Sequence, residues 1–170
     1  MKFQQHFDRI FTHLPSKGDL SLMTLKGHLL AEGLLEKIIR QFCARPEVLE
    51  SLQIHFVVKA AMARALVGDI QNKKLWELVG LLNNIRNHYG HQLESTKVRG
   101  MVVKFIETKH RDAGHVMPKI QNDEQLARMF GNAITYVLGG LMALEGAVIE
   151  HKAKGLRRVA LPSGEFKAAK

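Results

Sequence analysis

The apolar residues between positions 75 and 89 constrain the fold more than any other feature of the sequence. They recur in alternating steps of three and four residues, at Leu75, Leu78, Leu82, Ile85 and Tyr89. At about 100° of rotation per residue, this spacing places all five on one face of an α-helix. An apolar face of this kind must be covered by other elements. The segment is therefore predicted to be a core helix.

Helical spacing of apolar residues also extends over most of the remaining chain. We expect further helices over 3–14, from Ser21 to about Cys43, over 56–67 ending at Gly68, and from Asn122 or Asp123 onward, with a helical turn near 47–52. Residues 98–106 also permit a strand, but the helical surroundings favour a helix. The predicted fold is all-α, a bundle of long antiparallel helices.

Two of these helices have a predicted core face. In the helix from Ser21 the expected apolar face consists of Leu22, Leu25, Leu29, Leu30, Leu34, Leu35, Ile38, Ile39 and Phe42. In the last helix the expected interior positions are Leu126, Phe130, Ala133, Val137, Leu141, Leu144 and Val148. The glycines at 131, 139, 140 and 146 weaken that helix, and close helix contacts would compensate.

Length and composition indicate one soluble domain. The chain has 170 residues, 46% of them apolar, and has no linker rich in Pro and Gly. We expect a single helical domain over 1–154 and a basic, flexible tail over 155–170. The start of the chain does not resemble a secretory signal. The longest uncharged run, Met129 to Leu144, is too short to span a bilayer, so no membrane association is expected.

Charge and cysteine content bear on partners and compartment. With 25 basic and 16 acidic residues, the formal net charge is +9, which favours polyanions such as RNA as partners. The single Cys43 excludes an internal disulfide and suits a reducing cytoplasm. In an apolar helix it is better interpreted as a small buried side chain than as a nucleophile.

A group of polar residues lies at the end of the core helix that contains Leu75. Arg86, Asn87, His88 and His91 fall within six positions, and Asn83, Asn87 and His91 lie nearly in line. Positions 86 and 91 differ by about 140° around a regular helix. Either the helix loosens near Gly90, or two copies meet at a two-fold axis; we prefer the second. A helix end that merely attracts cations and imidazoles is the alternative.

The pattern Arg86-Asn87-x-x-x-His91 at the end of an apolar helix resembles the signature of the HEPN superfamily of small all-helical domains. That family often has alanine before the histidine, where this chain has Gly90. The resemblance covers roughly Leu20 to Lys152. It implies a HEPN-like bundle that forms a homodimer, in which Arg and His of two protomers line one cleft. Many members of the family cleave RNA without a metal, so no cofactor is expected.

The resemblance also implies roles for individual residues. His91 would accept the 2′-hydroxyl proton or protonate the leaving 5′-oxygen, and Arg86 would hold the phosphate and stabilise its developing charge. Asn87 would orient the phosphate or the imidazole. His88 and Tyr89 are possible auxiliary residues. The implied product is a 2′,3′-cyclic phosphate.

Residues outside the motif offer weaker candidates. His28, Glu32, Glu36 and Arg40 recur every four residues, and a solvent-exposed stripe, with Glu36 and Arg40 paired, is the favoured interpretation. Alternatively, His28 or Glu32 reaches the cleft, where a carboxylate near His91 would raise the pKa of the imidazole. The cationic segment 109–115, expected to be a loop, could extend an RNA track through Lys109 and Arg111.

Several other functions are disfavoured by the sequence. His88 and His91 could share one metal, but a third ligand at a recognised spacing is lacking, so no metal site is expected. Neither a phosphate-binding loop nor a dinucleotide-binding glycine motif is present.

The predicted function is an endoribonuclease toxin of a toxin–antitoxin or antiviral system, with an antitoxin or nucleotidyltransferase as partner.

Two non-enzymatic interpretations remain open. A looser resemblance to the mannitol operon repressor group suggests a non-catalytic regulator that binds protein or nucleic acid. The third possibility is a dimerisation module within a larger complex.

Overall fold

The computed structural model describes residues 18–68, 73–91 and 96–153. Within these ranges every regular element is helical, which confirms the all-α prediction. The elements are α2 (Leu20–Phe42), the short 3-10 helix η1 (Pro46–Ser51), α3 (Phe56–Val67), α4 (Lys73–His91), α5 (Thr96–Asp112) and α6 (Asp123–Ala153). The helix expected over 3–14 and the tail over 155–170 lie outside the described residues.

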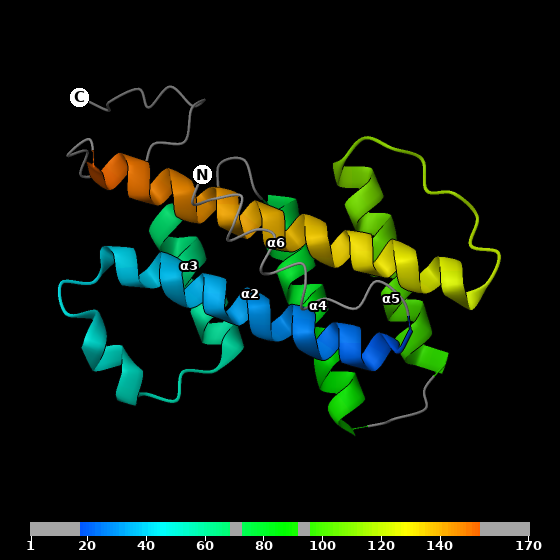
Figure 1. Cartoon of the computed structure of the whole chain (residues 1–170), viewed down its shortest axis with the longest axis horizontal. Helices are drawn as coiled ribbons and strands as arrows, with labels where there is room; N and C mark the ends of the chain where they lie inside the picture. Colours follow the sequence, from blue (N-terminus) through cyan, green and yellow to red (C-terminus); the bar gives the residue numbers. More distant parts are fainter. Residues whose placement is uncertain (1–17, 69–72, 92–95, 154–170) are drawn as a thin grey trace, which may run out of the picture.

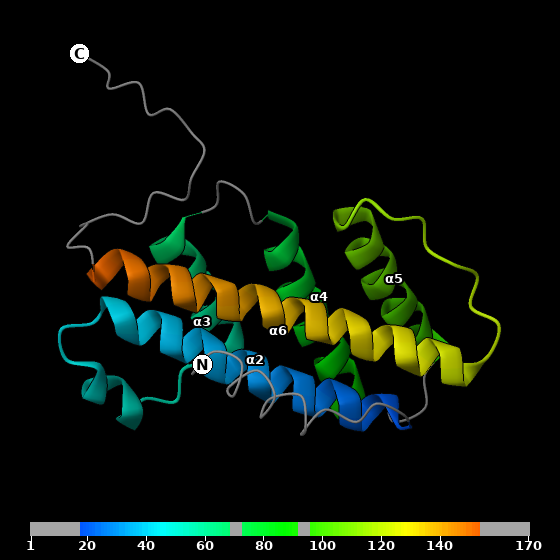
Figure 2. The same ribbon diagram turned by 45° about the horizontal axis from the view of Figure 1, so that its top comes forward.

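The helices form two layers. Figure 1 shows α2 and α6 side by side, with α3, α4 and α5 running across them behind, and Figure 2 shows the same arrangement from a tilted view. The layer of α3, α4 and α5 is antiparallel, as expected: Lys74 at the start of α4 lies near Arg111 and Asp112 at the end of α5.

The prediction of antiparallel long helices is wrong for α2 and α6, which run parallel. Gly27 contacts Ile134 in the first halves of these helices, and Lys152 near the end of α6 donates to the carbonyl of Gln41 near the end of α2. Apolar periodicity identifies the buried face of a helix but not its direction, so the sequence pattern allowed either orientation.

The core is formed by the apolar faces of α2, α3, α4, α5 and α6. Leu75, Leu78, Leu82 and Ile85 are buried, and Tyr89 is half-buried against the same core. All seven interior positions predicted for α6 are buried as well. The side chain of Asn122 accepts a hydrogen bond from the Gln125 backbone (2.8 Å), which confirms the expected cap of this helix.

Two glycines allow close helix contacts. A Cβ at Gly27 would lie 2.7 Å from Cγ2 of Ile134, and a Cβ at Gly140 would lie 2.9 Å from Cδ1 of Leu75. Gly140 therefore has the compensating contact that we expected for the glycines of α6. Gly139 and Gly146 have no such neighbour.

Two sequence expectations need correction. Leu22, Leu25 and Leu29 were expected in the core face of α2, yet they are 42%, 45% and 57% exposed. Because α6, α3 and α4 all pack on α2, its buried arc is set by these three neighbours, not by its own leucines. The segment 109–115 is not wholly a loop, because α5 continues to Asp112 before the chain turns at Gly114 (φ 69°).

The helix α6 is long and apolar enough to cross a membrane by length and composition alone. This finding differs from the sequence estimate, which counted only the uncharged run. In the fold, α6 packs against α2, α4 and α5, and its apolar positions supply much of the core.

Candidate functional site

A polar cavity of about 450 Å³ opens where α2, the start of α3 and the second half of α4 meet. The segment between η1 and α3 closes one side of it. Its polar lining combines two imidazoles, one near the middle of α2 and one just before α3, with charged and amide side chains. These residues are His28, Glu32, Gln53, His55, Lys59, Asn83, Arg86 and Asn87.

His28 is fixed in this wall by two neighbours. Its Nε2 donates a hydrogen bond to Oδ1 of Asn83 (3.2 Å), and its ring stacks on Phe56 with 4.0 Å between centroids. The side chain is only 5% exposed. The solvent-exposed stripe predicted for His28 is therefore wrong, because α3 and α4 cover this side of α2.

The environment of His28 favours the neutral ring. Burial lowers its pKa below the ordinary value of 6.5, and the positive charges of Arg86 and Lys59 act in the same direction. The hydrogen bond to Asn83 and the charge of Glu32 oppose this shift without cancelling it. The neutral ring keeps one N–H, which Nε2 donates to Asn83.

Asn83 is a site residue that the sequence reasoning did not select. It is 7% exposed and connects α4 to α2 through His28. The available signal was its alignment with Asn87, one helical turn away on the same face of α4. A polar amide within an apolar helix generally needs a partner when buried, and His28 supplies it here.

The structure brings Arg86 and Asn87 together at the mouth of the cavity. Both side chains are exposed, and Nη1 of Arg86 donates to Oδ1 of Asn87 (3.3 Å). A guanidinium and an amide at an open cavity can both bind the oxygens of a phosphate. Arg86 also lines a neighbouring cavity of about 590 Å³ together with Asp19 and Tyr89.

His88 and Tyr89 lie away from the polar cavity. His88 Nδ1 donates to the backbone carbonyl of Asn84 (3.1 Å), one turn earlier in α4. Tyr89 lines the neighbouring cavity, where burial and the nearby charge of Asp19 raise the pKa of its hydroxyl. Neither contact brings these residues to the side of α4 that carries Asn83 and Asn87.

His91 is the last residue of α4, and its side chain lies outside the described part of the structure. The backbone is α-helical through Gly90 to His91, so the helix does not loosen there. Positions 86 and 91 therefore keep the separation of about 140° expected on a regular helix. One chain does not bring these two positions to the same side of α4.

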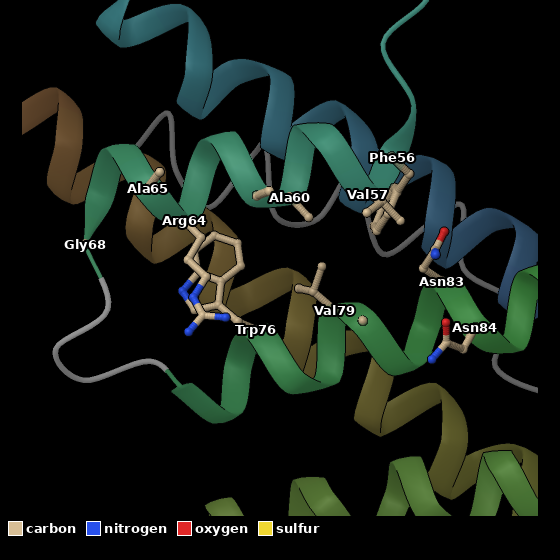
Figure 3. Close-up of a pocket in the computed structure, with 12 residues that line it drawn as sticks. Phe56, Val57, Ala60, Arg64, Ala65, Gly68, Trp76, Val79, Asn83 and Asn84 are labelled. Atoms are coloured by element: carbon tan, nitrogen blue, oxygen red, sulfur yellow. The ribbon is translucent and has the colours of Figure 1, made fainter.

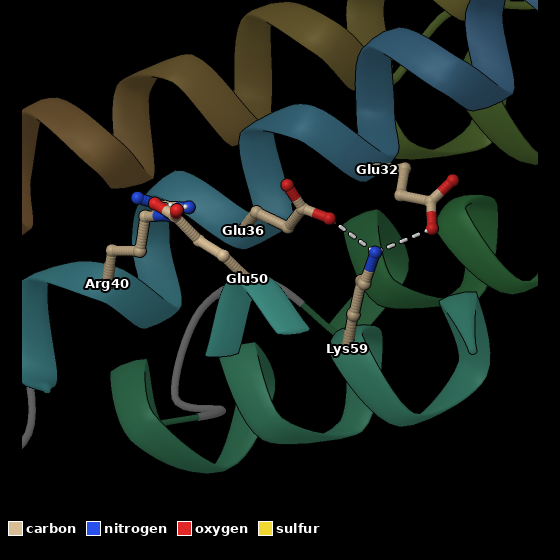
Figure 4. Close-up of polar contacts among 5 residues, drawn as sticks. All are labelled: Glu32, Glu36, Arg40, Glu50 and Lys59. Atoms are coloured by element: carbon tan, nitrogen blue, oxygen red, sulfur yellow. Dashed lines mark hydrogen bonds and ion pairs between the residues drawn. The ribbon is translucent and has the colours of Figure 1, made fainter. Parts of the chain in front are cut away.

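Glu32 and Glu36 are also not part of a free solvated stripe. Figure 4 shows both carboxylates bound by Lys59 of α3, with 2.7 Å between Lys59 Nζ and Glu32 Oε1. Burial lowers the pKa of Lys59, but hydrogen bonds to the two glutamates outweigh this effect and leave the pKa raised. Lys59 thereby joins α2 to α3. Arg40 pairs with Glu50 (2.9 Å), whereas a pair with Glu36 was expected.

Lys109 and Arg111 lie at the opposite end of α4 from the motif. Arg111 is 3.9 Å from Glu77, near the start of α4, and the ammonium of Lys109 lies 5.9 Å from the ring centre of Tyr136. Nine residues of helix separate Glu77 from Arg86, or about 14 Å. The structure therefore does not place these two cations in the wall of the polar cavity.

The cavity offers chemistry of a defined kind. It places the guanidinium of Arg86 beside amide side chains at an open mouth, which suits binding of a phosphodiester. Within the described ranges, no three His, Cys, Asp or Glu side chains are grouped as metal ligands. A comparison of the chain with models of protein families, with curated proteins and with solved structures found no match.

Proposed function

We propose that this protein is a metal-independent endoribonuclease of the HEPN type, acting as the toxin of a toxin–antitoxin or antiviral system. The observation that carries the proposal is the opening of Arg86 and Asn87 onto a cavity whose wall contains His28 and Asn83. The motif residues thus border a space that can accept a phosphodiester. The net charge of +9 supports a polyanionic substrate.

The chemistry requires only proton transfer and charge stabilisation. The ribose 2′-hydroxyl loses its proton to an imidazole and attacks phosphorus, while the bond from phosphorus to the 5′-oxygen breaks. The imidazolium formed in this way donates the proton to the leaving 5′-oxygen, which gives a 2′,3′-cyclic phosphate and a 5′-hydroxyl end. Arg86 stabilises the negative charge on the phosphate oxygens, and Asn87 orients them.

We assign the proton transfer to His91 of a second copy of the chain. Because α4 is helical through His91, one chain keeps positions 86 and 91 on different sides of the helix. A two-fold axis near the end of α4 would bring Arg86 of one protomer toward His91 of its partner. His28 then acts as a positioning residue, since it holds Asn83 and thereby the motif end of α4.

The direct test is cleavage of cellular RNA by the purified protein in EDTA. Arg86→Ala and His91→Ala should each abolish cleavage, whereas Arg128→Ala and His115→Ala, at exposed positions away from the cavity, should not. Expression of the wild type should arrest growth, and expression of the Arg86 variant should not. RNA cleavage retained by both motif variants would refute the assignment.

Mixing the two inactive variants tests the shared site separately. A mixed dimer contains one site with both Arg86 and His91 intact, so random exchange of subunits should restore roughly a quarter of wild-type cleavage. If subunit exchange is verified and RNA cleavage still does not recover, Arg86 and His91 do not act together in a site shared by two chains.

A non-catalytic regulator is the second candidate function. The burial of His28 between Asn83 and Phe56 favours it, because a side chain held by the fold has a structural role without any catalysis. RNA that is bound but not cut, with unchanged growth of expressing cells, would select this alternative.

A further inference from the structure

A second cavity lies between α3 and α4, beside the candidate site. Its volume is about 560 Å³, within the range of roughly 300–1,000 Å³ that is typical of small-molecule sites. Figure 3 shows its two ends: Asn83 and Asn84 at one, Arg64 and Trp76 at the other. Between them the walls are small and apolar, formed by Ala60, Ala61, Ala65, Val79 and Gly80.

We call this second cavity the groove. Trp76 in its wall carries a buried hydrogen-bond donor. Trp76 is only 6% exposed, and among the described residues its buried Nε1 has no hydrogen-bond partner. Leaving a buried polar group without a hydrogen bond is unfavourable, so such groups usually have a partner. A ligand with a hydrogen-bond acceptor would satisfy the indole.

The groove adjoins the candidate site, since Phe56, Val57 and Asn83 line both cavities. From Arg86 to Trp76 the groove follows ten residues of α4, a distance of about 15 Å. A strand held at Arg86 could extend along it over a few nucleotides. The guanidinium of Arg64 would then meet a further phosphate at the far end.

We propose that this groove binds a nucleotide of single-stranded RNA adjacent to the one held at Arg86 and Asn87. The base lies against the apolar walls, the amides of Asn83 and Asn84 contact its polar edge, and Trp76 Nε1 donates to a base or phosphate oxygen. Arg64 binds the next phosphate. This inference rests on the proposed function and extends it to substrate binding.

Trp76 provides a direct probe because it is the single tryptophan of the chain. A short RNA with 2′-O-methyl riboses lacks the attacking hydroxyl and should bind without being cut. Its addition should change the Trp76 emission, with the same midpoint as the anisotropy of a labelled copy. Ala61→Leu should fill the groove and weaken this binding about tenfold, while Arg64→Gln should weaken it and reduce its salt dependence.

The matched control is Ala143→Leu, the same change at an exposed position of α6. The inference would be overturned if RNA binds through Arg86 without changing Trp76 emission and if Ala61→Leu binds RNA as tightly as the wild type. The proposed function would then still stand. If Ala61→Leu fails to dimerise and its RNA affinity per chain is unchanged, the groove binds a second copy of the chain. That result would also overturn the inference. Absence of any RNA binding would overturn the proposed function.

Discussion

At the scale of single residues, His28 shows how one side chain can connect the core to the candidate site. It belongs to α2, its ring stacks on Phe56 of α3, and its Nε2 is hydrogen-bonded to Asn83 of α4. Three helices are therefore fixed around one imidazole. Burial lowers the pKa of the ring, because it disfavours the charged form.

This environment predicts a specific pH dependence of stability. The folded pKa of His28 lies below the ordinary value of 6.5, so the unfolded chain takes up this proton at a higher pH than the folded chain. The free energy of unfolding should fall as the pH drops through about 6.5 towards the folded pKa, and His28 should contribute no further change below it. Thermal unfolding followed by circular dichroism between pH 7.5 and about 5 measures this.

The His28→Gln variant isolates the effect, since a glutamine can still donate to Asn83 but does not titrate. Its stability should depend less on pH than that of the wild type. His115→Gln, at an exposed position, is the control and should behave as the wild type. If the stability of His28→Gln changes with pH as steeply as that of the wild type, another titratable group determines this pH dependence.

Single residues also show the limit of sequence reasoning about the site. The row of Asn83, Asn87 and His91 could be read from the period of one helix, as could the polarity of Arg86. The contact of His28 with Asn83 spans 55 positions in sequence and depends on how α2 packs on α4. The ion pairs of Lys59 could likewise not be predicted from the sequence, because its two carboxylate partners belong to another helix.

At the scale of helices, the contact between α2 and α6 depends on a missing side chain. Gly27 lets the two helices approach until Ile134 occupies the space of a Cβ. Isoleucine is branched at Cβ and has few alternative rotamers in a helix, so it cannot easily move aside. Periodicity identified α2 and α6 as core helices, but this close approach and their parallel direction arise only from packing.

Two alanine substitutions in α2 should therefore have opposite effects. Gly27→Ala should destabilise the protein by about 1–3 kcal/mol through overpacking against Ile134. Gly33→Ala meets no atom within 4 Å and should stabilise it by up to about 1 kcal/mol through helix propensity. Chemical denaturation of both variants checks this, and a stabilised Gly27→Ala would contradict the described contact.

At the scale of the whole molecule, the excess of basic residues should determine how RNA affinity responds to salt. With a net charge of +9, binding of single-stranded RNA should weaken linearly in a plot of log affinity against log salt concentration. Arg86→Ala should reduce the slope by about 0.7, the value for one lost phosphate contact with a single strand. Fluorescence anisotropy at several salt concentrations gives the slopes.

The exposed Arg128 supplies the comparison, because Arg128→Ala removes the same charge from a position outside the candidate site. An identical change of slope in both variants would indicate general attraction to the basic surface, with no specific phosphate contact at Arg86.

The antiparallel pairing of α4 and α5 has a consequence for the length of a nucleic acid. It places Arg86 at one end of α4 and the cations Lys109 and Arg111 near the other, beside Glu77 and Tyr136. Under the proposed function, an RNA held at Arg86 would reach these cations only by extending along the length of α4.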